Sequence, residues 1–219
     1  MTSVIEGEDG EAGVQDPAEN EDESTGKPRQ PSSGSLKDHQ LADDGRFSRS
    51  NKVIGHGSTK IVYHARDEEE GCDVAWNEVI RGTKEEDEWV IAKFKNEIKF
   101  LESLEHPNII TLLFKDVSSK RALFITEMLP GGTLKQFVAT SKKKKLQVKV
   151  IKKICKQLLF ALNYLHTRDP PVVHSDLKCD NIFIDSHNCE VKVGDFGLSG
   201  HCGDQLLTGI HQHRLEFVP

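Results

Sequence analysis

Short runs of alternating apolar and polar residues dominate the chain after residue 50, and glycines and charged turns separate them. An alternation of period two in runs of this length is typical of β-strands. The predicted strands are residues 52–55, 61–65 and 73–80, a strand that follows the turn at 106–110, and residues 122–127. We therefore expect a five-stranded sheet.

A helix is predicted to begin at Thr83, because Thr83 and Glu86 have the spacing of a capping box. Positions 90, 94, 97, 101 and 104 follow at alternating spacings of four and three, and four of them are apolar: Val90, Phe94, Leu101 and Leu104. The remaining position on this stripe is Glu97. A buried carboxylate without a cation costs several kcal/mol, so Glu97 needs a cationic partner unless it lies at the edge of the stripe and reaches water.

The pattern changes after residues 130–132, where Pro-Gly-Gly interrupts the chain. A second helix is predicted from apolar residues that recur at helical spacing: Val148, Ile151, Cys155, Leu158, Leu162 and Leu165. The lysine run at residues 142–145 precedes it and is best explained as a solvated loop, with a nuclear address or an anion-binding patch as alternatives. Strands before residue 130 and helices after it predict an α+β fold.

The first 45 residues form an acidic segment of Glu, Asp, Gly, Ser and Pro, with hardly any aromatic residue. So little apolar surface does not offset the entropy lost on ordering, and we predict a disordered tail. Its composition favours a solvating role over a regulatory or docking role. The chain of 219 residues has a net charge of −6, which argues against nucleic acid as the main partner.

Neither a membrane span nor a signal peptide is expected. No window of about eighteen apolar residues is present, and the N-terminus lacks a basic start and an apolar core. Five cysteines are scattered without any CxxC pair, which is typical of reduced thiols. These observations predict a cytoplasmic protein, and they leave its oligomeric state open.

Two motifs in the strand region point to nucleotide chemistry. Residues 55–62 read GHGSTKIV, a glycine-rich loop GxGxxGxV in which Lys60 stands in place of the third glycine. Residues 74–77 read VAWN, a VAIK-like strand with Asn77 in place of the lysine. By strand alternation Lys60 and Val62 share one face, and we expect Lys60 to lie beside Asn77.

The lysine is thus present at Lys60 in the glycine-rich motif and absent at Asn77 of the next strand. With this arrangement the stretch from Arg46 to Gly200 resembles the WNK (with-no-lysine) protein kinases. HPNII, VVHSDLKCDNIFI and VGDFG follow in the order and at the spacings of that family. The resemblance implies a bilobal fold, with a β-rich small lobe at residues 46–129 and an incomplete, mostly helical large lobe at 130–219. It also implies protein serine/threonine kinase activity.

The resemblance implies a site for ATP and Mg²⁺. Lys60 would contact the phosphates and pair with Glu97, and Thr126 would be the gatekeeper before the hinge at Glu127 and Met128. Its nucleotide-binding residues would be Gly55, Gly57, Val62, Ala75, Thr126, Glu127, Met128 and Phe183. Val62 and Ala75 would enclose the adenine from one side, and Phe183 from the other.

The motif at residues 174–181 resembles the kinase catalytic loop HRDLKxxN. Asp176 would accept the proton of the substrate hydroxyl, and Lys178 would neutralise charge on the transferred phosphoryl group. Asn181 and Asp195 would bind magnesium, because a hard cation takes oxygen ligands. The expected substrates are proteins, other kinases among them, in signalling to ion transport or osmotic response.

Several residues depart from the family pattern. Ser175 replaces the arginine that pairs with a phosphorylated activation loop in most kinases, and Phe196 replaces a leucine of the chloride-sensing region. The chain ends soon after Gly197, so a truncated, non-catalytic scaffold or a dominant-negative fragment is the alternative function. His201, Cys202, His211 and His213 have no common zinc spacing, and we favour a loop over a metal site there.

Overall fold

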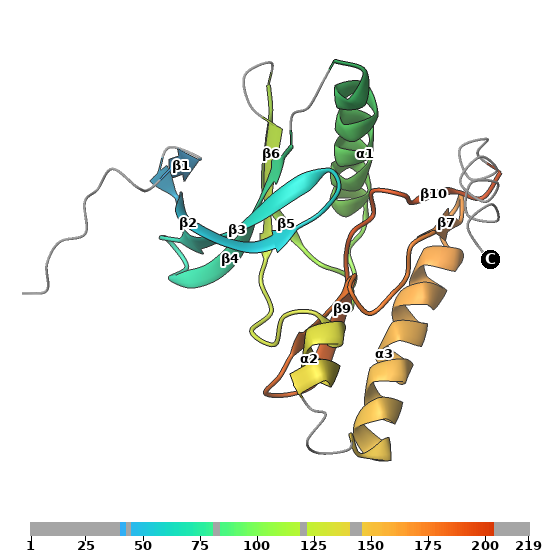
Figure 1. The fold of residues 1–219 in the computed structure, drawn as a ribbon. Helices are drawn as coiled ribbons and strands as arrows, with labels where there is room; N and C mark the ends of the chain where they lie inside the picture. Colours follow the sequence, from blue (N-terminus) through green and yellow to red (C-terminus); the bar gives the residue numbers. More distant parts are fainter. Residues whose placement is uncertain (1–39, 43–44, 81–83, 119–121, 141–145, 204–219) are drawn as a thin grey trace, which may run out of the picture. The chain divides into compact units, whose positions relative to one another are not determined.

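The computed structural model describes residues 40–42, 45–80, 84–118, 122–140 and 146–203 (Figure 1). Most of the acidic segment, Thr83 of the expected capping box and the lysine run at 142–145 lie outside the described residues. So do His211 and His213 of the alternative zinc site.

The strands form one antiparallel sheet in the order β1-β2-β3-β4-β6-β5. Their bounds are β1 Gln40–Ala42, β2 Phe47–His56, β3 Lys60–Asp67, β4 Cys72–Val79, β5 Leu112–Val117 and β6 Ala122–Glu127. The five predicted strands are present. The sixth, β1, falls inside the segment expected to be a disordered tail, and it pairs with the first residues of β2.

Each face of the sheet contributes residues to a buried core. One face carries a core built around Trp76, which is fully buried together with Phe47, Val74 and Ile125. The other face is covered by α1, Lys84–Ser103, where the rings of Phe94 and Phe124 lie 5.0 Å apart (Figure 1). Aromatic pairs at this separation pack favourably, so this contact fixes α1 against the centre of the sheet.

The apolar stripe predicted for α1 is confirmed for Phe94, Leu101 and Leu104, which are buried. Glu97 is buried with them, at 3% exposure. Its carboxylate is therefore not at a wet edge of the helix, and the cationic partner required by its burial must lie within the fold.

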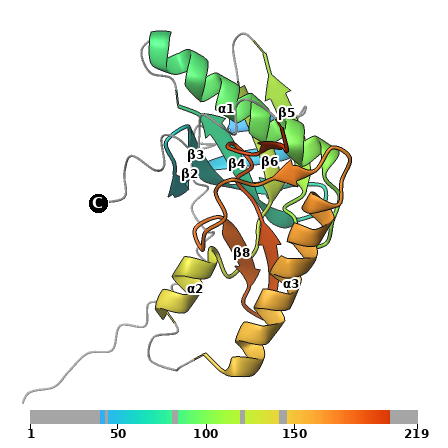
Figure 2. The ribbon, with the colours of Figure 1, turned by 90° about the vertical axis from the view of Figure 1, so that its right-hand side faces the viewer.

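The remaining elements pack around a β-hairpin. Strands β8 Ile182–Asp185 and β9 Glu190–Val193 form the hairpin, and helices α2 Leu134–Thr140 and α3 Val148–His166 lie on either side of it (Figure 2). Two short strands, β7 Val172–Val173 and β10 Gly200–His201, pair beyond it. With the sheet before residue 130 and these elements after it, the predicted α+β fold is confirmed.

The stripe predicted for α3 is wrong in its first half. Val148, Ile151 and Cys155 are exposed, and the helix instead buries Ile154, Ala161 and Leu165. The physical reason is that apolar residues occupy more than half of the circumference of α3, so a periodicity of 3.6 does not single out one face.

The turn at residues 106–110 joins the sheet to the hairpin. The Asn108 amide donates to the carbonyl of Val191 at 2.8 Å, and the backbone N–H of Ile110 donates to the carbonyl of Val193 at 2.9 Å. These bonds satisfy backbone acceptors that would otherwise be buried unpaired. In the part of the chain that the structure describes, no helix combines the length and apolar character needed to cross a membrane.

Replacing Phe94 with alanine should lower the free energy of unfolding by about 3–5 kcal/mol, because a buried ring is lost from the contact between α1 and the sheet. Trp89→Ala is the matched control on the same helix, since Trp89 is 56% exposed, and it should change stability by no more than about 1 kcal/mol. Urea denaturation measures both. Equal losses in the two variants would contradict the packing described for α1.

Candidate functional site

The cationic partner of Glu97 is Lys60. The Nζ atom of Lys60 on β3 forms an ion pair and a hydrogen bond with Oε1 of Glu97 on α1, across 37 residues of sequence. The Lys60 ammonium also lies 5.0 Å from the centre of the Phe124 ring. The pairing predicted from the sequence between a strand lysine and the carboxylate on the helix stripe is therefore present.

Burial raises the pKa of the Glu97 carboxyl above its ordinary value, the Lys60 ammonium opposes this, and the charge of Asp195 adds to it. The Asp195 charge acts on Glu97 although the two residues are far apart in the sequence. The carboxylate of Glu97 thus interacts electrostatically with both the expected phosphate cation, Lys60, and the expected magnesium ligand, Asp195.

The strand register corrects one detail of the expected geometry. Lys60 lies opposite Val79, and it is Val62 that lies opposite Asn77. Lys60 is a diagonal neighbour of Asn77 on the same face, because residues two apart on a strand point to the same side. The Asn77 amide is turned to its own strand and donates to the carbonyl of Ala75 at 3.1 Å.

The expected adenine-binding residues of the sheet share one face. Gly55 of β2 pairs with Val62 of β3, and Ala75 of β4 pairs with Thr126 of β6. In the turn between β2 and β3, the N–H of Gly57 donates to the carbonyl of Lys60 at 2.9 Å. The structure thus places the loop glycines, the moved lysine and these three side chains along adjacent strands.

The expected hinge follows β6. The N–H of Glu127 is already used, since it donates to the carbonyl of Thr111 at 3.1 Å. The carboxylate of Glu127 accepts from the N–H of Thr111 and from Lys192 Nζ, each at 2.7 Å. The half-buried Met128 has no backbone hydrogen bond to another described residue, so its N–H and C=O are available to a planar ligand.

The catalytic-loop residues form one hydrogen-bonded cluster. Lys178 Nζ lies 2.8 Å from Oδ2 of Asp176, and the Asn181 amide donates to the same oxygen at 3.0 Å. Asp176 is buried at 7% exposure, whereas the Lys178 side chain is half-exposed. A fixed carboxylate with an adjacent, more exposed ammonium is suited to orient a hydroxyl beside a phosphate.

His174 forms hydrogen bonds with the backbone on two sides of this cluster. Its Nδ1 accepts from the N–H of Asp176 at 3.3 Å, and its Nε2 donates to the carbonyl of Gly194 at 3.0 Å. A neutral imidazole satisfies both bonds at once. Burial lowers the pKa of His174, which keeps the ring neutral, although the nearby Asp195 and Asp176 charges oppose this.

Asp195 follows β9 and is held close to Asn181. The N–H of its neighbour Gly194 donates to the backbone carbonyl of Asn181 at 2.9 Å. The Asn181 side-chain oxygen and the Asp195 carboxylate have no hydrogen bond or ion pair among the described residues. One amide oxygen and one carboxylate make a donor set of the kind that Mg²⁺ takes, so the residues present fit a magnesium ion.

Phe183 on β8 packs against the backbone of Gly194. A Cβ at residue 194 would lie 2.9 Å from the Phe183 ring and 3.2 Å from Ile110, so glycine is required there by close approach. This contact fixes the half-buried Phe183 ring beside the segment that carries Asp195.

Two contacts of the site were not predicted. Lys192 on β9 reaches Glu127 across 65 residues, and His174 joins the catalytic loop to Gly194. The motif contains His174 and could have indicated it. No signal in the sequence points to Lys192, because a lysine at an outward strand position is usually solvated.

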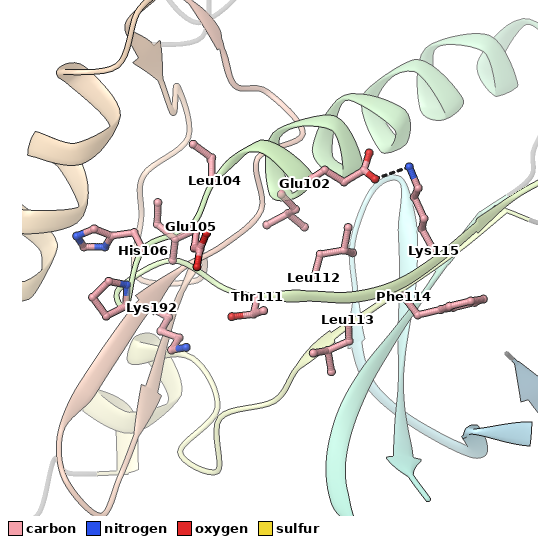
Figure 3. A pocket seen from close by; sticks show the side chains of 13 residues that line it. Glu102, Leu104, Glu105, His106, Thr111, Leu112, Leu113, Phe114, Lys115 and Lys192 are labelled. Carbon is pink, nitrogen blue, oxygen red and sulfur yellow. Dashed lines mark ion pairs between the residues drawn. The ribbon is translucent and has the colours of Figure 1, made fainter. Parts of the chain in front are cut away.

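A cavity of about 950 Å³ lies between the end of α1 and β5, and Lys192 is one of the residues that line it (Figure 3). Its walls include Leu104, Leu112 and the ion pair between Glu102 and Lys115, and none of the expected nucleotide-binding residues lines it. Among the described residues, no three or more His, Cys, Asp or Glu side chains come together as a metal-binding group. His201 instead packs against Phe100, with ring centres 5.4 Å apart, and Cys202 is exposed.

Comparison with known proteins agrees with the motif analysis. A family model described as "Protein kinase domain" matches residues 48–211. The chain is 38% identical over 181 residues to a protein named probable serine/threonine-protein kinase WNK6 from Oryza sativa subsp. japonica, which covers 80% of this chain and 40% of that protein.

Two further relatives carry similar names. Serine/threonine-protein kinase WNK8 of Arabidopsis thaliana is 41% identical over 157 residues, covering 71% of this chain and 28% of the relative. Serine/threonine-protein kinase WNK of Caenorhabditis elegans is 40% identical over 162 residues, covering 71% of this chain and 8% of the relative. The resemblance to WNK kinases is confirmed, and the chain spans less than half the length of each relative.

The neutral state of His174 predicts a dependence of stability on pH. Because its folded pKa lies below the ordinary value of 6.5, its contribution is present above pH 6.5 and is lost as the pH falls through the folded pKa. Between pH 7.5 and 5.0 the wild type should therefore lose more stability in urea denaturation than His174→Gln does. The control His187→Gln, at an exposed site, should follow the wild type. Parallel pH profiles for wild type and His174→Gln would show that His174 is not buried in its neutral form.

Proposed function

Because the chain belongs to the protein kinase family, we propose that it transfers the γ-phosphate of ATP to serine and threonine hydroxyls of proteins. The observation that carries this proposal is the ion pair between Lys60 and Glu97. It supplies a held cation on β3, while the position of the usual lysine on β4 holds Asn77. The names of the WNK relatives support the same relocation.

Lys60 acts on the phosphates of the nucleotide. Its ammonium is fixed by Glu97 and by the Phe124 ring, so little side-chain entropy remains to be lost when a phosphate binds. A cation oriented in advance stabilises charge better than a mobile one, because it needs no reorganisation during the reaction. Gly55 and Gly57 leave the backbone of the loop without side chains near the phosphates.

Asp176 accepts the proton of the substrate hydroxyl, and Lys178 neutralises charge on the phosphoryl group in transfer. The two side chains are in contact at 2.8 Å, so a hydroxyl bound to the carboxylate lies beside the ammonium. The amide of Asn181 holds the same carboxylate oxygen at 3.0 Å and thereby sets its direction. General base catalysis of this kind contributes typically 10²–10⁴-fold to the rate.

Asn181 and Asp195 would hold a magnesium ion through their side-chain oxygen atoms. The ion would supply neutralisation of phosphate charge. The neutral ring of His174 keeps the backbone of both segments in place without adding a positive charge that would repel the metal.

The adenine lies on the shared face of the sheet. Val62 and Ala75 contact it from the side of the sheet, Phe183 contacts it from the hairpin, and Thr126 limits the depth of the pocket. The backbone N–H and C=O of Met128 bind the polar edge of the base. The N–H of Glu127 does not, because it donates to the carbonyl of Thr111.

The wider role proposed for the protein is signalling in the cytoplasm, with other protein kinases as substrates and ion transport or osmotic response as the output. It rests on the resemblance to WNK kinases. Five free cysteines support a reducing compartment. The competing function is a non-catalytic scaffold, and the assay below separates the two.

Transfer of labelled γ-phosphate from Mg·ATP to a basic protein substrate tests the proposal. Lys60→Met should lower kcat/KM by about 10²–10³-fold, because the fixed phosphate cation is lost. Asp176→Asn should lower kcat by at least about 10²-fold, because the proton acceptor is lost. Lys52→Met, at an exposed site on β2, is the matched control and should retain activity.

No transfer by the wild type would favour the scaffold and overturn the proposed activity. Transfer that persists in Lys60→Met would show instead that another group supplies the phosphate cation.

A further inference from the structure

The segment from Gly194 to Ser199 carries Asp195 and is held at both of its ends. Gly194 bonds Asn181 and His174, and Gly200 pairs with Val173 in the small sheet of β7 and β10. The hydroxyl of Ser199 also donates to the carbonyl of His174 at 3.1 Å. The ends of this segment are thus tied to the catalytic loop and its surroundings.

The middle of the segment is in an uncommon conformation. Asp195 has φ +60, in the left-handed region that residues with a side chain rarely adopt. Such a conformation persists only when the surrounding structure determines it. Burial of Phe196 supplies one constraint, since its ring packs 4.8 Å from that of His174.

The second constraint comes from α1. The side-chain amide of Asn96 donates to the carbonyl of Ser199 at 2.8 Å and lies 3.2 Å from that of Gly197. The carbonyl of Phe196 is within 3.4 Å of the same nitrogen. Only the amide nitrogen can face three carbonyl oxygens, because the amide oxygen would repel them.

Asn96 stands next to Glu97 on the helix. One helical turn earlier, the aliphatic part of the Lys93 side chain packs against Gly197. A Cβ atom added to Gly197 would lie only 3.0 Å from carbon atoms of Lys93. The same stretch of α1 therefore holds Lys60 through Glu97 and the turn of Asp195 through Asn96. A displacement of α1 that separates Lys60 from Glu97 also removes the bonds of Asn96.

We propose that Asn96 is a positioning residue of the phosphoryl-transfer site, which fixes the turn that carries Asp195 and so couples magnesium binding to the position of α1. The proposal rests on the proposed function in one respect, the role of Asp195 as a magnesium ligand. Asn96 itself touches neither nucleotide nor metal, and it acts through the carbonyl groups of residues 196, 197 and 199.

The test is equilibrium binding of a fluorescent ATP analogue, trinitrophenyl-ATP, to the full chain, first in EDTA and then over a range of Mg²⁺ concentrations. Asn96→Leu has nearly the same shape as asparagine but no donor. It should raise the Mg²⁺ concentration for half-maximal binding by about tenfold, while affinity in EDTA stays within about twofold, since it loses one or two hydrogen bonds.

Asn96→Gln keeps the amide on a longer stem and should return to within about threefold of the wild type. Asn163→Leu makes the same substitution at an exposed site of α3 and should leave both affinities unchanged. The ratio of the two affinities is taken on the folded protein, so partial unfolding of a variant does not alter it.

Unchanged Mg²⁺ dependence in Asn96→Leu, or equal weakening with and without Mg²⁺, would overturn the positioning role. Phosphate transfer by the wild type is measured in parallel. If the wild type transfers phosphate and Asn96→Leu keeps the wild-type Mg²⁺ dependence of binding, only this inference is overturned. If Asn96→Leu changes the Mg²⁺ dependence but the wild type transfers no phosphate, only the proposed activity is overturned. Nucleotide binding by the wild type without any Mg²⁺ dependence, or no nucleotide binding at all, would overturn the metal role of Asp195 and the inference together.

Discussion

The burial of one carboxylate organises the site. Glu97 lies on the apolar side of α1, next to the contact of Phe94 with Phe124, where an uncompensated charge would cost several kcal/mol. Lys60 compensates it, and this fixes the distance between α1 and β3. Once α1 is fixed, its other side chains are fixed too, and Asn96 meets the turn of Asp195 from there. The ion pair is therefore a positional constraint more than a source of stability, because desolvation offsets much of its Coulombic gain.

A second set of contacts connects the sheet to the hairpin β8–β9. Asn108 and Ile110 bond the backbone of β9, and Lys192 of β9 bonds Glu127 at the end of β6. These contacts hold the sheet against the hairpin β8–β9. The expected phosphate cation lies on the sheet, and the expected proton acceptor and metal ligands lie in the segments next to the hairpin. A reaction between two bound groups needs such fixed relative placement.

The sequence predicts the local part of this arrangement well, and the reasons are physical. Period-two runs predict the five strands, and the stripe of α1 predicts the burial of Glu97, because each depends only on neighbours along the chain. The face of α3 was wrong, since Ile151 and Ile154 are both apolar and only tertiary packing decides between them. Lys60 lies opposite Val79 and is a diagonal neighbour of Asn77, a detail of register that strand alternation alone does not give. The contacts of Lys192 and Asn96 join residues 65 and about 100 positions apart, and no local pattern encodes them.

In the proposed mechanism, Lys60 on β3 supplies the cation that contacts the nucleotide phosphates. An ATP analogue with a reactive acyl phosphate at its end acylates the lysine that lies against the phosphates, and mass spectrometry then identifies the modified residue. We expect acylation of Lys60 that excess ATP prevents, with or without additional labelling of Lys178. Labelling of Lys178 or Lys192 that leaves Lys60 unmodified would contradict it.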